Sequence, residues 1–272
     1  MDKNNLTKAQ RLEIAEWLAE ERLEYINAQC KAVNLSTHKI YIKYVKRIID
    51  IFVSLLALII TLPINLLIGI ITLFDVGIPI FFRQERVGKD GKIFELVKFR
   101  NMKDIKDANG DLLHASLRVT KFGKFMRKTS LDELLNFWCI LKGDMSLIGP
   151  RPLVPEYSQR YNIRHRYRLA VKPGLECPPR NKKTDTHTWQ EQFENDVWYV
   201  ENVSFLTDCK MLWNLFWFTI NSKATSQRAS VSQKGSFMGY DLEGKAINLD
   251  EVPQSYIDIY EKCASRKCDA VL

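Results

Sequence analysis

The sequence lacks the features by which many small proteins are classified at once. Its six cysteines form no Cys-x-x-Cys pair, and its four histidines are not spaced as metal ligands. Neither a disulfide framework nor a zinc site is indicated, which favours a reducing compartment. The first residues are polar and lack the apolar core of a signal peptide, and no internal repeat is visible. Cys139 and Cys209 lie among apolar residues, so we expect both thiols to be buried.

The composition is that of a folded protein with an excess of positive charge. Of the 272 residues, 46% are hydrophobic and 26% are charged, and 40 Lys and Arg outnumber 32 Asp and Glu. The length allows one sizeable core, or one domain with appendages. The formal net charge of +8 fits nucleic acid, an anionic membrane or a phosphorylated substrate as the partner. Composition does not choose among these three.

One long stretch, residues 51–74, contains no charged side chain and is almost entirely aliphatic. A run of this length predicts contact with a membrane. Pro63 at its midpoint removes a backbone donor, so we expect a break at Leu62 and Pro63, with two arms of about 18 Å each returning to one face. Basic residues flank both ends, which favours a re-entrant hairpin over the alternative, a single kinked span. They are Lys39, Lys43, Lys46 and Arg47 before the stretch, and Arg83, Arg86, Lys89 and Lys92 after it.

Several further elements are predicted around this segment. Residues 6–30 have the pattern of an amphipathic helix, with Ile14, Trp17, Leu18 and Tyr25 on one stripe. Two β-prone runs, 79–86 and 92–102, flank a Gly-Lys-Asp-Gly turn and predict a β-hairpin. Helices are expected at 130–141, at 206–220 and from about residue 253. The aromatic side chains of 206–220 suit either the headgroup zone of a membrane or an ordinary buried helix.

The pair Asp132 and Glu133 follows Ser130 at the start of a predicted helix. Ser130 and Glu133 have the spacing of a capping box, in which Glu133 only reaches back to the Ser130 amide. The alternative is phosphate chemistry, because a helix N-terminus binds phosphate and Arg127 and Lys128 come just before it. One carboxylate can then hold Mg²⁺ while the other attacks phosphorus.

A loop rich in glycine and proline follows at 143–152. Gly143 is expected to end the preceding helix. Pro150 and Pro152 restrict the backbone on both sides of Arg151. A rigidly held arginine suits a bidentate grip on phosphate, although such a loop taken alone is more often a plain turn.

Five motifs then stand in order: KRIID (46–50), FRQERVG (82–88), KFRNM (98–102), RKTSLDEL (127–134) and KGDMSLIGPRP (142–152). With the apolar segment interrupted by proline, they resemble the bacterial sugar transferase family, the monotopic polyprenyl-phosphate phosphoglycosyl transferases. The similarity covers about residues 43–220. Several long motifs in the right order are far more specific than one short pattern.

The resemblance implies an enzyme at the cytoplasmic face of the bacterial inner membrane. It implies that Asp132 attacks the β-phosphate of a UDP-sugar, releases UMP, and passes the sugar phosphate to polyprenyl (undecaprenyl) phosphate to start a cell-surface glycan. Asp132 and Glu133 would hold Mg²⁺. The implied phosphate-binding residues are Arg127, Arg151, Lys98 and Arg100. The lipid bilayer is the other expected partner, nucleic acid is not expected, and a homo-oligomer is compatible with the resemblance.

These considerations predict an α/β fold with few strands. It is a small membrane-associated domain with a re-entrant membrane hairpin, a β-hairpin and amphipathic interfacial helices. The predicted parts are an N-terminal amphipathic helical extension (1–42), the membrane hairpin (43–78), the phosphoglycosyl transferase domain (79–221), and a linker with a C-terminal extension (222–272). The two extensions lie outside the resemblance and receive no role.

The sequence departs from the family pattern at two places. Relatives carry Ser-Pro where this chain has Leu62 and Pro63, and we expect the Thr61 hydroxyl to bond the carbonyl that Pro63 frees. After Pro173 and Gly174, residues 175–181 read LECPPRN where the family has a Thr-Gly-Trp/Leu-Ala-Gln-Val-Asn/Ser-Gly-Arg run. The altered loop affects the expected donor contacts and leaves an alternative, a catalytically inactive relative that acts as a membrane-surface scaffold or binding protein. The intact carboxylate pair favours activity.

Overall fold

The computed structural model describes residues 3, 6–107, 110, 112–113, 115–180, 188–220 and 235–269. The helices are α1 (Lys8–Gln29), α2 (Lys46–Val76), α3 (Ala115–Arg118), α4 (Lys121–Thr129), α5 (Asn136–Lys142), α6 (Ile163–Arg166), α7 (Trp189–Asn202), α8 (Phe205–Ile220) and α10 (Gln254–Asp269). The strands are β1 (Phe81–Val87), β2 (Ile93–Phe99), β3 (Ser146–Ile148), β4 (Gly174–Glu176), β5 (Phe237–Tyr240) and β6 (Ala246–Asn248). A π-helical turn (Tyr41–Val45) leads into α2, and short 3₁₀ turns occupy Lys89–Gly91, Leu131–Glu133, Pro155–Arg160 and Tyr167–Ala170. The predicted mixture of helices and strands is confirmed.

Three two-stranded sheets are present in the described part of the chain. β1 and β2 pair antiparallel from Phe81 opposite Phe99 to Val87 opposite Ile93, which confirms the predicted β-hairpin. β3 and β4 pair in parallel, and β5 and β6 pair antiparallel. The sequence pattern predicts none of these last four strands, each of which has only three or four residues.

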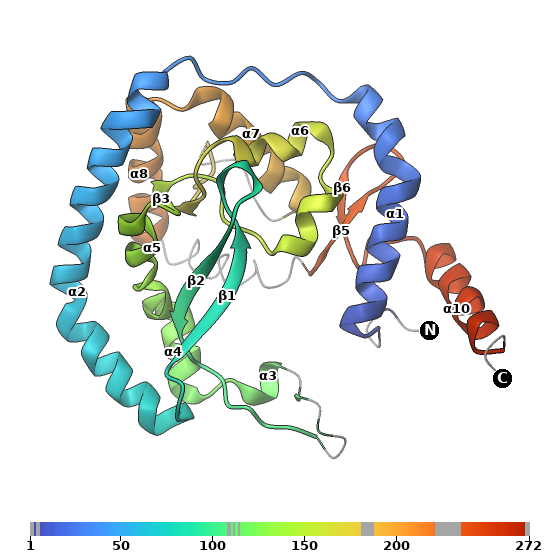
Figure 1. The fold of residues 1–272 in the computed structure, drawn as a ribbon, viewed down its shortest axis with the longest axis horizontal. Coiled ribbons are helices and arrows are strands. Elements are labelled where there is room, and N and C mark those ends of the chain that lie inside the picture. Colours follow the sequence, from blue (N-terminus) through green and yellow to red (C-terminus); the bar gives the residue numbers. More distant parts are fainter. Residues whose placement is uncertain are drawn as a thin grey trace.

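The β-hairpin stands at the centre of the molecule, and α5 packs beside it (Figure 1). Apolar side chains of β2 and of the α5 segment share one buried cluster: Phe94, Leu96, Cys139, Ile140 and Met145. Gly143 ends α5 with a φ of 104°, as predicted for a helix C-terminus. Strand β2 also contacts the 3₁₀ turn Leu131–Glu133. The core therefore brings the C-terminal end of β2 to the segment that carries Asp132 and Glu133.

Helix α2 differs from the predicted hairpin. It continues without interruption through Pro63, and it curves along the rim of the molecule instead of folding back on itself (Figure 1). The break expected at Leu62 and Pro63 is therefore not present in this structure. A proline within a helix removes one hydrogen bond and bends the axis, and here the turns on either side continue.

The expectation for Thr61 is also wrong. Its hydroxyl donates to the carbonyl of Ala57 (2.7 Å) and accepts a bond from the Asn65 amide (3.1 Å). A threonine hydroxyl in a helix reaches the carbonyl four residues before it, whereas Pro63 frees the carbonyl of Ile59. The Thr61 bond therefore supports the turn before the proline and leaves the freed carbonyl without this partner.

Most apolar side chains of α2 are exposed. The buried residues of this helix are Asp50, Ser54, Ile68 and Thr72, whereas Phe52, Ile59 and Phe74 project outward. Among the described residues, the continuous helical stretch Tyr41–Val76 is the one long and apolar enough to cross a membrane. A core helix of a soluble protein would be mostly covered, so this apolar surface indicates association with a membrane.

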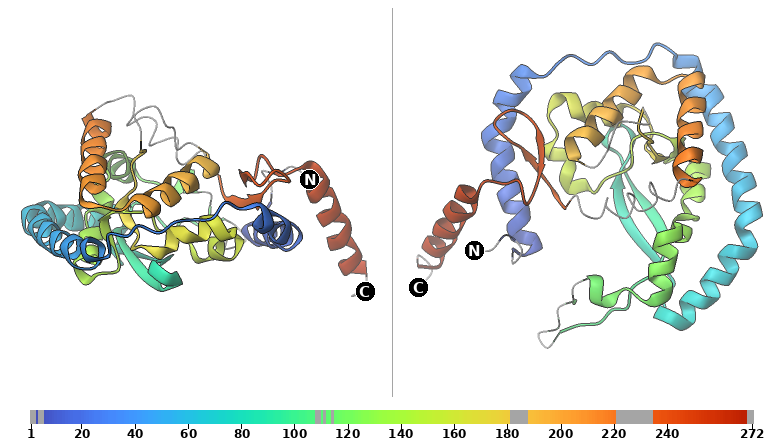
Figure 2. Two further views of the ribbon diagram at one scale, coloured as in Figure 1. Left: turned by 90° about the horizontal axis from the view of Figure 1, so that it is seen from above. Right: turned by 180° about the vertical axis from the view of Figure 1, so that it is seen from behind.

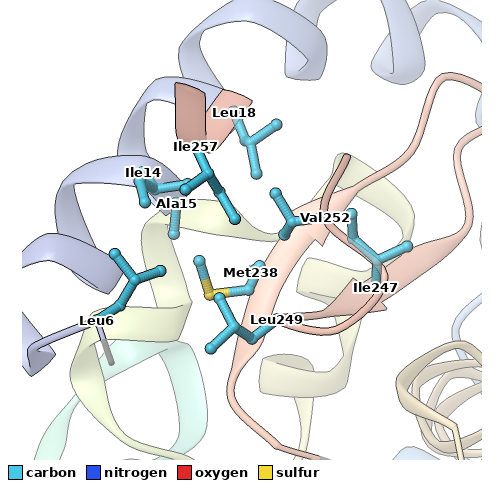
Figure 3. Packing of buried hydrophobic residues seen from close by; sticks show 9 residues of the cluster. All are labelled: Leu6, Ile14, Ala15, Leu18, Met238, Ile247, Leu249, Val252 and Ile257. Atoms are coloured by element: carbon cyan, nitrogen blue, oxygen red, sulfur yellow. The ribbon is translucent and has the colours of Figure 1, made fainter. Parts of the chain in front are cut away.

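Helix α1 and the C-terminal extension form one small unit on the side of the molecule opposite α2 (Figures 1 and 2). Their shared core is shown in Figure 3 and contains Leu6, Ile14, Ala15, Leu18, Met238, Ile247, Leu249, Val252 and Ile257. The predicted stripe on α1 is right for Ile14 and Leu18 but wrong for Tyr25, whose side chain is exposed. The buried stripe instead continues to Ile26, at helical spacing from Leu18. The first part of the predicted linker, residues 222–234, lies outside the described residues.

Helix α8 presents aromatic side chains to the outside. Trp213 and Phe216 are each more than half exposed and stack on one another, with ring centres 6.0 Å apart. Cys209 on the same helix is exposed as well, so the expectation of a buried thiol holds for Cys139 alone. Apolar neighbours in sequence do not bury Cys209 because this face of α8 is not covered by the described part of the chain. An exposed aromatic face fits the headgroup zone better than a buried helix.

Candidate active site

Ser130 forms the junction between α4 and the 3₁₀ turn that carries the carboxylate pair. Its backbone is left-handed (φ 57°, ψ 22°), which ends α4 and redirects the chain. Its side chain makes no capping bond, and Glu133 reaches two cations rather than the Ser130 amide. The capping-box interpretation is therefore wrong. A left-handed residue at the cap position cannot offer the extended geometry that the capping box requires.

The side chain of Glu133 is held between two positive charges. Its Oε1 accepts hydrogen bonds from Lys98 Nζ and from Arg151 Nη2, both at 2.6 Å. Burial opposes the ionised form, but Arg151 and Lys98 outweigh it and lower the pKa of Glu133 to about 2. Glu133 is thus a permanent carboxylate at neutral pH.

Asp132 lies beside it in a different environment. The side chain is 6% exposed, and its Oδ2 accepts a hydrogen bond from Asn101 Nδ2 (3.1 Å). Burial, which is only partly opposed by Lys98, raises the pKa of Asp132 above its usual value. Arg127 donates to Asn101 Oδ1 (3.0 Å) and so reaches Asp132 through this amide. The nucleophile predicted from the sequence is therefore oriented by a neutral donor instead of being locked into an ion pair.

Asn101 is a site residue that the sequence analysis did not assign, although it stands in one of the quoted motifs. Its backbone is packed tightly against α4: a Cβ added at Gly123 would lie 2.2 Å from the carbonyl oxygen of Asn101. A glycine at 123 is therefore what lets α4 approach closely enough for Asn101 to face Asp132. Gly123 was the available signal, because a glycine inside a helix has a cost that usually reflects close packing.

The loop that carries Arg151 is fixed by its backbone. Gly149 and Gly174 approach so closely that a Cβ on Gly174 would lie 2.1 Å from the Gly149 nitrogen. Arg168 donates to the carbonyl of Arg151 (2.7 Å), and its guanidinium is ion-paired with Asp196 (2.8 Å) in the interior. The rigid arginine predicted from the flanking prolines is present, and parallel pairing of β3 with β4 is what positions it.

Part of this site borders a small pocket, which Asp132 and Asn101 do not line. Its lining includes Arg86, Lys98, Glu133, Arg151 and Pro152. Arg86 was not predicted as a site residue; its Nε is buried without a hydrogen-bond partner in the structure. Three cations around one opening make a site for phosphate groups.

Arg100 is placed differently from the other predicted cations. Its guanidinium bonds the carbonyl of Pro79 (3.0 Å) and the carboxylate of Asp104 (2.8 Å). It does not line the pocket, because Arg100 comes after the last residue of β2 and its guanidinium is bound to Pro79 and Asp104. The structure thus brings Asp132, Glu133, Lys98 and Arg151 together directly. Arg127 joins this group through Asn101. Arg100 joins it by none of the contacts described.

The carboxylate pair also fits a magnesium ion. Within the described residues no cluster of three or more His, Cys, Asp or Glu side chains gathers. Mg²⁺ in phosphate-transfer sites is commonly bound by one or two carboxylates together with substrate phosphates and water. The bonds described above end on Oε1 of Glu133 and Oδ2 of Asp132, so Oε2 and Oδ1 take part in none of them. Asp132 and Glu133 therefore have the ligand type that Mg²⁺ prefers, and water and substrate phosphates would have to supply the other ligands.

Comparison with known proteins identifies the family. The bacterial sugar transferase family matches residues 41–222. The sugar transferase EpsL of Bacillus subtilis is 41% identical over 167 residues, which are 61% of this chain and 83% of EpsL. The galactosyl transferase CpsE of Streptococcus agalactiae is 37% identical over 190 residues, 61% of this chain and 40% of CpsE. The undecaprenyl-phosphate galactose phosphotransferase of Salmonella typhimurium is 35% identical over 197 residues, 62% of this chain and 39% of that protein.

These relatives are all named as transferases, and this chain is a transferase as well. The chain belongs to the bacterial sugar transferase family, as its motifs predicted. The chain spans most of EpsL but only about two fifths of the other two relatives. The matched range also agrees with the predicted extent of the resemblance, and it leaves α1, β5, β6 and α10 outside the family region.

Proposed function

We propose that this protein transfers a sugar 1-phosphate from a UDP-sugar to undecaprenyl phosphate, with release of UMP. The observation that carries the proposal is the contrast within the carboxylate pair: Glu133 is ion-paired with Lys98 and Arg151, whereas Asp132 accepts a hydrogen bond from the neutral amide of Asn101. One carboxylate is thus paired with the cations of the pocket, and the other is available for attack. Relatives named as undecaprenyl-phosphate sugar phosphotransferases support the same substrate classes.

The proposed reaction has two steps. First, an oxygen of Asp132 attacks the β-phosphorus of the UDP-sugar; the bond from that phosphorus to the bridging oxygen breaks, and UMP leaves with the electron pair. Second, a phosphate oxygen of the lipid attacks the same phosphorus, the bond to Asp132 breaks, and the carboxylate is regenerated. Arg151, Lys98 and Arg127 would neutralise the charge that develops on the phosphoryl oxygens.

We include Mg²⁺ in the proposal, held by Asp132 and Glu133. When bound, it would supply positive charge at the phosphate oxygens of the donor. Asn101 orients Asp132 independently of the metal, because its hydrogen bond needs no ion.

The proposal also places α2 in one leaflet, with both of its ends on the cytoplasmic side. Near its start, Arg47 donates to the carbonyls of Ile140 and Leu141 (2.6 and 2.7 Å). Near its end, Asp75 accepts a hydrogen bond from Thr120, and Ile68 is buried with Phe99 and Met126. Both ends therefore touch the same domain, whereas a spanning helix would carry one end across about 30 Å of hydrocarbon. These contacts support a monotopic attachment without the predicted break.

Cysteine labelling tests this topology. In intact cells that carry Lys39→Cys or Lys92→Cys in a Cys209→Ser background, neither new thiol should react with a membrane-impermeant reagent applied from outside. Both should react equally after the membrane is opened, because both positions are exposed on the protein. Labelling of one position but not of the other in intact cells would show that α2 spans the membrane.

The function itself is tested with a panel of donors. The full chain in detergent, supplied with undecaprenyl phosphate and Mg²⁺, should release UMP from at least one UDP-sugar in a one-to-one ratio with lipid-linked sugar phosphate. A chelator should abolish the release if the carboxylates hold a metal. A folded protein that releases no UMP from any donor would favour the alternative of an inactive scaffold.

A further inference from the structure

Both terminal nitrogens of Arg151 are occupied by carboxylates. Nη2 bonds Glu133 at 2.6 Å, and Nη1 lies 3.5 Å from Oε2 of Glu176. A guanidinium grips a phosphate with two parallel N–H groups. In this structure, a phosphate that bound the edge formed by Nη1 and Nη2 would have to displace one of the two carboxylates.

Glu176 is the carboxylate that is able to move. Glu133 also has Lys98 as a partner and is 19% exposed, whereas the side chain of Glu176 is 33% exposed and has its weaker contact to Arg151. Partly exposed ion pairs of this kind contribute little to stability and are easily exchanged for another anion. An incoming phosphate is such an anion.

The position of Glu176 is nevertheless fixed by the fold. It is the last residue of β4, and its carbonyl accepts a hydrogen bond from the Gly149 amide (3.2 Å), two residues before Arg151. Any side chain at position 176 therefore projects beside the Arg151 loop.

We propose that Glu176 is the resting partner of Arg151, displaced when nucleotide phosphates bind, and that it sets how tightly the pocket holds the donor and the UMP product. This inference rests on the proposed function for the identity of the nucleotide. Glu176 acts through Arg151 and is a positioning residue that does not react. Its negative charge also opposes the approach of the diphosphate, so both effects weaken binding.

The test compares Glu176→Gln with the wild-type chain. Glutamine keeps the shape and an oxygen acceptor but removes the charge. We expect the affinity for UMP, measured by titration calorimetry, to rise about three- to tenfold, consistent with a partly exposed ion pair near a phosphate. The KM for the donor and the product-inhibition constant for UMP should fall by the same factor, with no increase in kcat. Glu176→Asp should stay near the wild-type values, and Glu176→Ser should shift both constants in the direction of Glu176→Gln.

Glu201→Gln is the matched control. Glu201 is also partly buried and paired with an arginine, Arg164 at 3.7 Å, but it lies on α7 outside the pocket. The affinity of the Glu201→Gln variant for UMP should equal that of the wild type. Unchanged or weaker UMP binding in Glu176→Gln would overturn the inference, as would an equal gain in Glu201→Gln. Because calorimetry needs no turnover, failure of every donor to react would count against the proposed function alone.

Discussion

Asp132→Asn is expected to fold normally and to form no covalent sugar-phosphate adduct. Asparagine keeps the shape of the side chain, and its carbonyl oxygen can still accept the hydrogen bond from Asn101. A neutral amide is a poor nucleophile, so turnover should fall at least about a thousandfold, or about 4 kcal/mol in activation free energy. The measurement uses labelled UDP-sugar and Mg²⁺ without lipid. The wild type should retain label and release about one equivalent of UMP per site, and the variant should do neither.

Two further variants separate this result from a general loss of structure. Glu133→Gln should also lose activity, because it leaves Lys98 and Arg151 without their shared carboxylate. Asp250→Asn, on the exposed surface of the C-terminal extension, should behave like the wild type. Substantial turnover by Asp132→Asn, without conversion of Asn back to Asp, would end the proposal of a covalent intermediate.

Asp196→Ala should destabilise the protein more than any surface change. Asp196 and Arg168 are 1% and 2% exposed and form a buried ion pair at 2.8 Å. Removing one partner leaves an uncompensated charge in the interior, which costs about 3–5 kcal/mol of unfolding free energy. Arg168 also bonds the Arg151 carbonyl and the Tyr161 hydroxyl, so the Arg151 loop should loosen as well. Denaturant unfolding in a fixed detergent measures the loss.

The exposed pair between Lys8 and Glu156 provides the comparison. Its distance is similar (3.0 Å), but the Lys8 side chain is 81% exposed. Lys8→Ala should therefore change the unfolding free energy by less than about 1 kcal/mol. If both variants lose equally little, the Arg168 pair contributes no more than a surface contact.

The sequence predicted features that depend on local pattern. The β-hairpin follows from two β-prone runs around a glycine turn, and the end of α5 follows from Gly143. The sequence did not show whether Glu133 would bond the Ser130 amide or the side chains of Lys98 and Arg151. A capping bond to Ser130 is local, whereas Lys98 is 35 positions away and meets Glu133 only after β2 has packed against α5. Long-range electrostatics overrides a local motif here.

The same limit explains the other errors. Pro63 is a strong local signal for a break, yet α2 stays helical because only one hydrogen bond is removed there and the residues near both ends of the helix are buried against the domain. β5 and β6 are buried on nearly every residue, so they show no alternation between polar and apolar positions. Cys209 and Tyr25 are exposed because no other element packs against their face of the helix in the described part of the chain. The composition of a helix does not specify which of its faces will be covered.

The unit shown in Figure 3 determines the order in which the chain can acquire its structure. Arg22 on α1 donates to the carbonyl of Tyr240, 218 positions later, and Ile14 is buried only among residues that include Met238 and Val252. During synthesis, α1 is made before those residues, and its buried face has no partner until they have followed. The loop to be closed is among the longest in the chain, and its entropy is lost before these contacts are gained. The contacts that join α1 to β5, β6 and α10 are therefore among the last that the chain can complete.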